Sequence, residues 1–171
     1  MVRVADRLTT LDTTFLALED EVTPLHVGSV MVFDVPAQGL DYGLLVQHIA
    51  DRIAYVPRYR QRLRAVPGGF ANPVWVDDER FDVTYHVRRS ALPRPGSDEQ
   101  LEELVARIMP RPLDRERPLW EVYVVEGLAD DRFAIISKAH QVLVDGVHAV
   151  DLTQIILDDT PTTRITGTSW R

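Results

Sequence analysis

The sequence predicts a domain of the α/β (α+β) class, in which helices pack on a mixed β-sheet. Short segments rich in β-branched residues alternate with amphipathic helical patterns, and we find no internal repeat. The 171 residues suffice for one domain with a core and are too few for two domains of ordinary size. An apolar fraction of 45% and a charged fraction of 26% are typical of a globular protein.

The first half of the chain contains a strand, a helix and two further strands. Leu25–Val35 is β-branched and ends beside Pro36, which predicts a strand. Asp41–Val56 carries apolar residues at helical spacing and is followed by Pro57, so we expect a helix there. The segments "PVWVDD" (73–78) and "DVTYHVRRSAL" (82–92) predict two short strands separated by an acidic turn.

The second half contains a capped helix, a strand pair and a last helix. Ser97 and Gln100 have the spacing of a capping box, and apolar residues at i, i+3, i+4 and i+7 follow. Residues 119–128 and 132–144 predict two strands joined by the turn "ADD". A final helix is expected to begin at or just after Asp145 and to run toward Leu157. Residues 1–158 thus form the predicted domain, and the polar tail 159–171 is interpreted as the start of a linker.

Composition excludes several classes of function. The net charge of −7 argues against a general nucleic-acid binder, which needs a basic surface. The chain has no cysteine, so thiolate nucleophiles, disulfides and cysteine-bound metals are excluded. No apolar run reaches 18 residues and the N-terminus lacks a signal-peptide pattern, so a cytoplasmic protein is the expectation.

The candidate site is "SKAHQVLVDGVHAV", residues 137–150. His140 and Gln141 follow an apolar strand pattern, and ligands commonly bind where such strands end. Asp145 and Gly146 fit a tight turn and a helix cap, and from spacing alone that structural role is the more common one. In a regular strand His140 and Gln141 would point to opposite faces, so only one of them could face a substrate.

The other polar patterns favour structural roles. We expect Pro118, Leu119 and Trp120 to pack in the core, and His26, His48 and His86 to be structural. Arginines at alternate positions share one face if the segment is extended, where they could attract anionic phosphate groups, although a solvated face is the more common outcome; these are Arg58, Arg60, Arg62 and Arg64. The spacing of His140 and His148 is a poor match to zinc sites, so no metal is expected.

Six segments, in this order, carry a resemblance to a known family. They are "LTTLDTTFLALED", "TPLHVGSVMVFD", "PRYRQRL", "PVWVDDERFDVTYHV", "LDRERPLWEVYVVEGL" and "KAHQVLVDGVHAVDL". The chain resembles the N-terminal half of the bacterial wax ester synthase/diacylglycerol acyltransferase family. That family belongs to the CoA-dependent acyltransferases, with chloramphenicol acetyltransferase and condensation domains. The resemblance implies one chloramphenicol-acetyltransferase-like domain of a two-domain enzyme.

The family's active-site pattern, HHxxxDG, maps onto this chain without a gap. The resemblance places the first histidine at His140, the general base at Gln141, and the Asp-Gly pair at Asp145 and Gly146. It implies O-acyl transfer from acyl-CoA, which is a substrate rather than a cofactor, to diacylglycerol or a fatty alcohol. It also implies a C-terminal half as partner and peripheral contact with a membrane or lipid body.

Gln141 departs from this pattern, because a carboxamide cannot accept a proton near neutral pH. Three explanations remain: a substitution introduced to trap an inactive form, a natural paralogue with reduced catalysis, or a shifted register that makes His140 or His148 the base. The third needs the strand alternation to break and is the least favoured. A non-catalytic relative that binds acyl-CoA or lipid, or regulates an active partner, is the alternative function.

Overall fold

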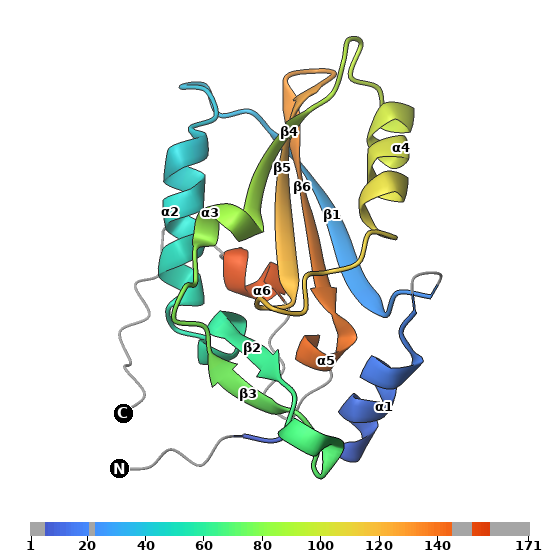
Figure 1. The fold of residues 1–171 in the computed structure, drawn as a ribbon. Coiled ribbons are helices and arrows are strands. Elements are labelled where there is room, and N and C mark those ends of the chain that lie inside the picture. The colour runs from blue at the N-terminus through green and yellow to red at the C-terminus, as the bar shows by residue number, and fades with distance from the viewer. Residues whose placement is uncertain (1–5, 21–22, 145–151, 158–171) are drawn as a thin grey trace.

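The computed structural model describes residues 6–20, 23–144 and 152–157. Its main sheet has the strand order β1-β6-β5-β4 (Figure 1). The strands are β1 (His26–Asp34), β4 (Val87–Ala91), β5 (Trp120–Leu128) and β6 (Arg132–His140). β4 and β5 are parallel and the other pairs are antiparallel, so the sheet is mixed, as predicted.

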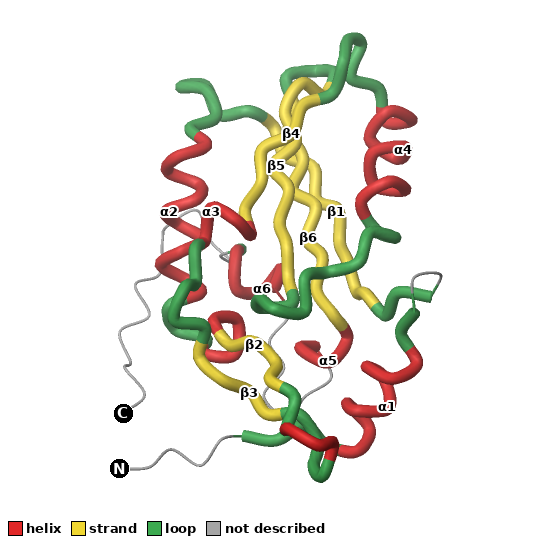
Figure 2. Tube along the Cα trace, viewed as in Figure 1, coloured by secondary structure: helices red, strands yellow, loops and turns green. Residues whose placement is uncertain are grey.

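Helices cover both faces of this sheet. α2 (Tyr42–Ile53) and α6 (Leu152–Ile156) lie on one face, and α4 (Asp98–Ile108) lies on the other (Figure 2). One buried cluster surrounds Trp120 on the α2 side, and a second lies beneath α4. Two short helices, α1 (Thr10–Leu18) and α5 (Gln141–Val144), lie at the end of the sheet where β6 stops.

The predicted start of α4 is confirmed. Ser97 Oγ accepts a hydrogen bond from the Gln100 backbone N–H, and Gln100 Oε1 accepts one from the Ser97 N–H. Leu101 and Ile108 are buried against the sheet, as the helical spacing requires. This capping box satisfies amide groups that have no partner inside the helix.

The alternating arginines do not share one extended segment. Pro57–Arg60 forms a 3-10 helix (η1), and only Gln61–Arg64 forms a strand (β2), which pairs with β3 (Val74–Asp77). A second short 3-10 helix, η2 (Pro67–Gly69), joins the two strands. Arg58 and Arg60 instead stack on aromatic rings, which fixes them locally.

The strand predicted over 82–92 is wrong in its first half. Val83–His86 forms a helical turn (α3), because Asp82 accepts hydrogen bonds from the backbone and hydroxyl of Thr84. Such local side-chain bonds compete with strand pairing. His86 is buried, its ring stacks 4.5 Å from that of Trp120, and its Nδ1 lies 2.7 Å from the Trp120 carbonyl oxygen.

Candidate active site

β6 ends at His140, four residues earlier than predicted. Gln141 begins the helical turn α5, so the strand alternation that was expected to separate His140 from Gln141 does not reach Gln141. The His140 N–H donates to the Leu119 carbonyl, and the Gln141 N–H donates to the Leu25 carbonyl, each at 2.9 Å. These two bonds hold the junction between strand and helix.

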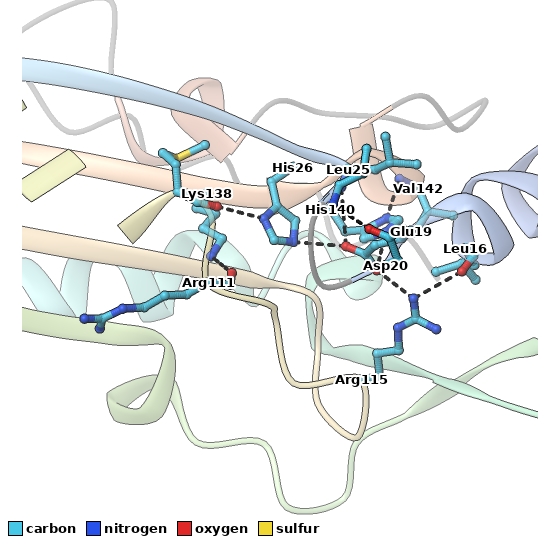
Figure 3. Close-up of polar contacts among 12 residues, drawn as sticks. Leu16, Glu19, Asp20, Leu25, His26, Arg111, Arg115, Lys138, His140 and Val142 are labelled. Carbon is cyan, nitrogen blue, oxygen red and sulfur yellow. Dashed lines mark hydrogen bonds and ion pairs between the residues drawn. The ribbon is translucent and has the colours of Figure 1, made fainter. Parts of the chain in front are cut away.

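The imidazole of His140 is almost fully buried, with 1% of its surface exposed. Its Nδ1 accepts a hydrogen bond from the Val142 N–H at 3.1 Å, which assigns the ring proton to Nε2. Nε2 lies 3.3 Å from a carboxylate oxygen of Glu19 (Figure 3). The Val142 bond therefore fixes the tautomer, and the ring proton faces the Glu19 carboxylate.

Glu19 is the centre of the polar cluster in Figure 3. It follows the last residue of α1, and its two carboxylate oxygens lie 3.2 Å from His26 Nε2 and 3.3 Å from His140 Nε2. Arg115 reaches the same carboxylate at 2.7 Å. Burial raises the pKa of Glu19, but the Arg115 hydrogen bond and the charges of His140, Arg115 and His26 outweigh burial. The pKa therefore lies below its usual value, and the group is a carboxylate.

His26 faces hydrogen-bond acceptors with both of its ring nitrogens. Its Nδ1 lies 3.1 Å from the Met109 carbonyl oxygen, and its Nε2 faces Glu19. A neutral ring has one N–H and satisfies only one of these acceptors. Burial lowers the pKa of His26, although the Met109 bond and Glu19 act in the opposite direction, and burial is also the largest cause lowering the pKa of His140.

Gln141 is partly buried at the first position of α5, next to this cluster. The one lone pair of the His140 ring, on Nδ1, already accepts from the Val142 amide, which argues against the alternative that His140 is the base. Asp145, Gly146 and His148 lie outside the described residues. Of the four residues predicted for the catalytic pattern, the described ranges therefore contain His140 and Gln141.

Pro118, Leu119 and Trp120 are all buried. The Trp120 indole N–H donates to the Tyr59 carbonyl at 2.7 Å, and the Leu119 carbonyl receives the His140 N–H. The triplet therefore packs in the core, as expected, and also fixes the backbone of His140.

Sequence reasoning missed Glu19, Arg115 and the role of His26. Glu19 is close to the end of "LTTLDTTFLALED", a segment used above only for its resemblance to a family. No spacing rule joins it to His140, since the contact depends on how α1 lies against the end of β6. Within the described ranges, no cluster of histidine and acidic residues is arranged to hold a metal ion. None of the helices described is long and apolar enough to cross a membrane.

Comparison with known families gives a match over almost the whole chain. The model of the "Wax ester synthase/diacylglycerol acyltransferase catalytic domain" matches residues 8–171. A protein named probable diacylglycerol O-acyltransferase from Mycobacterium tuberculosis is 51% identical over 154 residues, which cover 90% of this chain and 57% of that protein. A second protein of that name from this organism is 45% identical over 156 residues, covering 90% of this chain and 33% of its own length. The chain thus spans about half or less of these relatives.

Solved structures show the same fold. The wax ester synthase/diacylglycerol acyltransferase from Marinobacter aquaeolei superposes with a TM-score of 0.69 at 38% identity, over 82% of this chain and 35% of that one. The first condensation domain of the calcium-dependent antibiotic synthetase superposes with a TM-score of 0.64 at 17% identity, over 84% of this chain and 35% of that domain. The predicted acyltransferase-type α+β fold is therefore confirmed.

Proposed function

Because the chain belongs to the wax ester synthase/diacylglycerol acyltransferase family, we propose that it is the N-terminal half of an O-acyltransferase. The reaction transfers a long-chain acyl group from acyl-CoA to diacylglycerol or a fatty alcohol. The acceptor oxygen bonds to the thioester carbonyl carbon, the carbon–sulfur bond breaks, and the hydroxyl proton must pass through a base to the leaving thiolate. The observation that supports this proposal is the match over residues 8–171, together with the placement of His140 and Gln141 at the end of β6.

His140 acts in this proposal as a positioning residue. Its ring is buried between the Val142 amide and the Glu19 carboxylate, and its backbone N–H bonds the Leu119 carbonyl. These contacts set where the neighbouring backbone of residue 141 leaves the sheet. A side chain at 141 is thereby presented from a rigid junction, which is the arrangement a general base needs.

Gln141 occupies the position of the base but cannot take the proton, so we propose that catalysis by this chain is impaired. Loss of a positioned general base typically lowers a rate about 10²- to 10⁴-fold. The amide can still accept a hydrogen bond from the acceptor hydroxyl and hold it. The same residue supports the alternative function, a non-catalytic relative that binds acyl-CoA or lipid.

A C-terminal half is the proposed partner, and acyl-CoA needs no further cofactor in this scheme. Support comes from the greater length of the relatives and from exposed apolar residues on the edge strand β1, which are Val27, Val30 and Val32. Val30 and Val32 also line an apolar groove of about 570 Å³ against α4. Exposed apolar surface of this kind is characteristic of a protein interface.

The test is an acyltransferase assay of the full-length protein with Gln141 and with Gln141→His. Long-chain acyl-CoA is supplied with diacylglycerol or a fatty alcohol, and thiol release and ester are measured together. We expect the histidine form to make ester about 10²- to 10⁴-fold faster. Equal rates would show that another group is the base. If both forms bind acyl-CoA and neither makes ester, the binding relative is the better account.

A further inference from the structure

The turn between β2 and β3 presents an aromatic ring to solvent. Phe70 is 93% exposed, more than any other large apolar side chain in the described part of the chain. It follows Gly68 and Gly69, whose φ angles of +76° and +68° are left-handed and favour glycine. A Cβ on Gly68 would lie 2.3 Å from the Phe70 ring, so the ring packs directly over this glycine. The turn thus holds the ring on the outside of the molecule.

Two arginines lie beside this turn, one in β2 and one in the segment before α1. Arg64 of β2 and Arg7 both pair with Val74 of β3, one on each side of the strand. Residues paired in this way point to the same face, and the neighbouring Leu63–Trp75 pair points inward to the core. Arg7 and Arg64 are exposed, and neither forms an ion pair with any residue that the structure describes.

The start of α1 lies against the same turn. The Leu8 N–H donates to the Pro73 carbonyl, and the Asn72 side chain donates to the Leu8 carbonyl. Leu11, in the first turn of α1, is 62% exposed. Phe70, Leu11, Arg7 and Arg64 together are called the turn surface below, and Figure 1 shows α1 and the β2–β3 turn at one end of the molecule.

We propose that the turn surface binds the surface of an anionic phospholipid membrane. Guanidinium groups attract phosphate headgroups, and an exposed aromatic ring on the same turn enters the interfacial layer. The chain carries a net charge of −7, so an anionic surface would repel it unless cations gathered at the point of contact. A ring projecting from a convex turn offers little area to a partner protein, which needs several hundred Å².

This inference rests on the proposed function, because it explains how a lipid acceptor reaches the site. α1 contains nine residues, about 14 Å of helix, and its C-cap residue is Glu19 of the candidate site. One short helix therefore joins the turn surface to the cluster around His140. A protein docked at this end takes its acceptor directly from the lipid layer.

The experiment measures sedimentation of the full-length protein with vesicles of phosphatidylcholine, with and without 30% phosphatidylglycerol. We expect binding to the anionic vesicles to fall about fivefold for each arginine removed in Arg7→Ser and Arg64→Ser. Phe70→Ser is expected to weaken it at least about fivefold. Leu44→Ser on α2, 69% exposed, and Arg94→Ser in the exposed β4–α4 loop are matched controls and should change binding less than about twofold.

A site-specific probe distinguishes the membrane from other occupants. The 171 residues contain no cysteine, so Phe70→Cys and Leu44→Cys each place one environment-sensitive dye within them, cysteines elsewhere in the protein being replaced. Anionic vesicles should raise the fluorescence at position 70 and not at position 44. Three outcomes would overturn the proposal. The protein could bind neutral vesicles equally well, or the control substitutions could weaken binding as much as those in the turn surface. A dye at position 70 could also be shielded before vesicles are added. Vesicle binding is measured without any catalytic turnover, whereas ester formation in detergent micelles tests the proposed function without a bilayer. The membrane proposal and the proposed function can therefore fail separately.

Discussion

Glu19 is the residue on which the candidate site depends most. Its carboxylate lies between His26 and His140 and accepts from Arg115, so one side chain fixes three others. A carboxylate beside a neutral imidazole holds its tautomer and orientation. Glu19 is therefore a positioning residue that acts through His140.

Replacing Glu19 by glutamine tests this role with almost no change in shape. Glu19→Gln removes the charge that raises the pKa values of His140 and His26, so both values should fall further in an NMR titration. The free energy of unfolding should fall by about 1–2 kcal/mol as the Arg115 contact weakens. Ester formation in the Gln141→His background should decrease about tenfold or more.

Glu116→Gln is the matched control, since the Glu116 side chain is 87% exposed and its one ion-pair partner within the described ranges is Arg62, at 3.4 Å. It should leave the histidine titrations and the activity unchanged. Unaltered histidine pKa values in Glu19→Gln would contradict the contacts described here.

The sequence was informative about residues that are neighbours along the chain. His140 and Gln141 were singled out by a contiguous motif of the family that the chain resembles, and they lie next to each other where β6 ends and α5 begins. Glu19 and Arg115 could not be found in this way, because they meet His140 only after α1 and the segment before β5 have packed at the end of the sheet.

At the scale of elements, α4 is fastened to the sheet by a buried lysine. Lys138 of β6, the one lysine of the sequence, is fully buried. Its Nζ donates to the carbonyl of Ile108, the last residue of α4, and to that of Arg111 in the segment just after the helix. An ammonium group suits this end of a helix, where carbonyl groups lack partners. Burial lowers the pKa of Lys138, and the charge of Glu121 opposes that effect.

Lys138→Met should lower the free energy of unfolding by about 1–3 kcal/mol, because two carbonyls lose their donor. Amide hydrogen exchange in the last turn of α4 should become faster than in its first turn. Arg107→Met, on the exposed side of the same helix, should change stability by less than about 0.5 kcal/mol. Equal effects of the two substitutions would show that the ammonium group does not hold α4.

Element boundaries were predicted wrongly where side chains form hydrogen bonds with backbone N–H groups that a longer strand would use for pairing. The pattern "HQVLV" favours a longer strand, yet the Val142 N–H bonds the His140 ring instead of a neighbouring strand, so β6 ends there. Asp82 ends the strand pattern before β4 in a similar way. A local pattern does not contain these contacts.

For the whole molecule, the buried histidines predict how stability depends on pH. Burial lowers the pKa values of His26, His86 and His140 below the ordinary value of 6.5. Below about pH 6.5 the unfolded chain binds protons that the folded chain does not bind. The contribution of these neutral histidines to the free energy of unfolding is therefore fully present above that pH and is lost as the pH falls below it.

Denaturant unfolding between pH 7.5 and 5.5 should show a loss of about 1–3 kcal/mol. His86→Phe should reduce the slope, since it removes one of the three groups and retains an aromatic ring beside Trp120. A free energy of unfolding that stays constant or rises toward pH 5.5 would contradict the burial of these rings.

The fold class was predictable from the whole sequence, whereas the order of the strands was not. Alternating strand and helix patterns establish an α+β domain. They do not encode that β6 pairs between β1 and β5, or that β4 lies parallel to β5. Those pairings come from contacts between distant segments, and they place the end of β6 next to Glu19.

The most direct test of the central claim is the pH profile of kcat/KM for ester formation by Gln141→His in the full-length protein. If position 141 is that of the general base, the rate of this variant should rise with pH across the titration of a histidine, near 6.5. The Gln141 form should stay about 10²- to 10⁴-fold slower at the top of this profile and lack that step. Coincident profiles of equal rate would contradict the assignment and move the base to another residue.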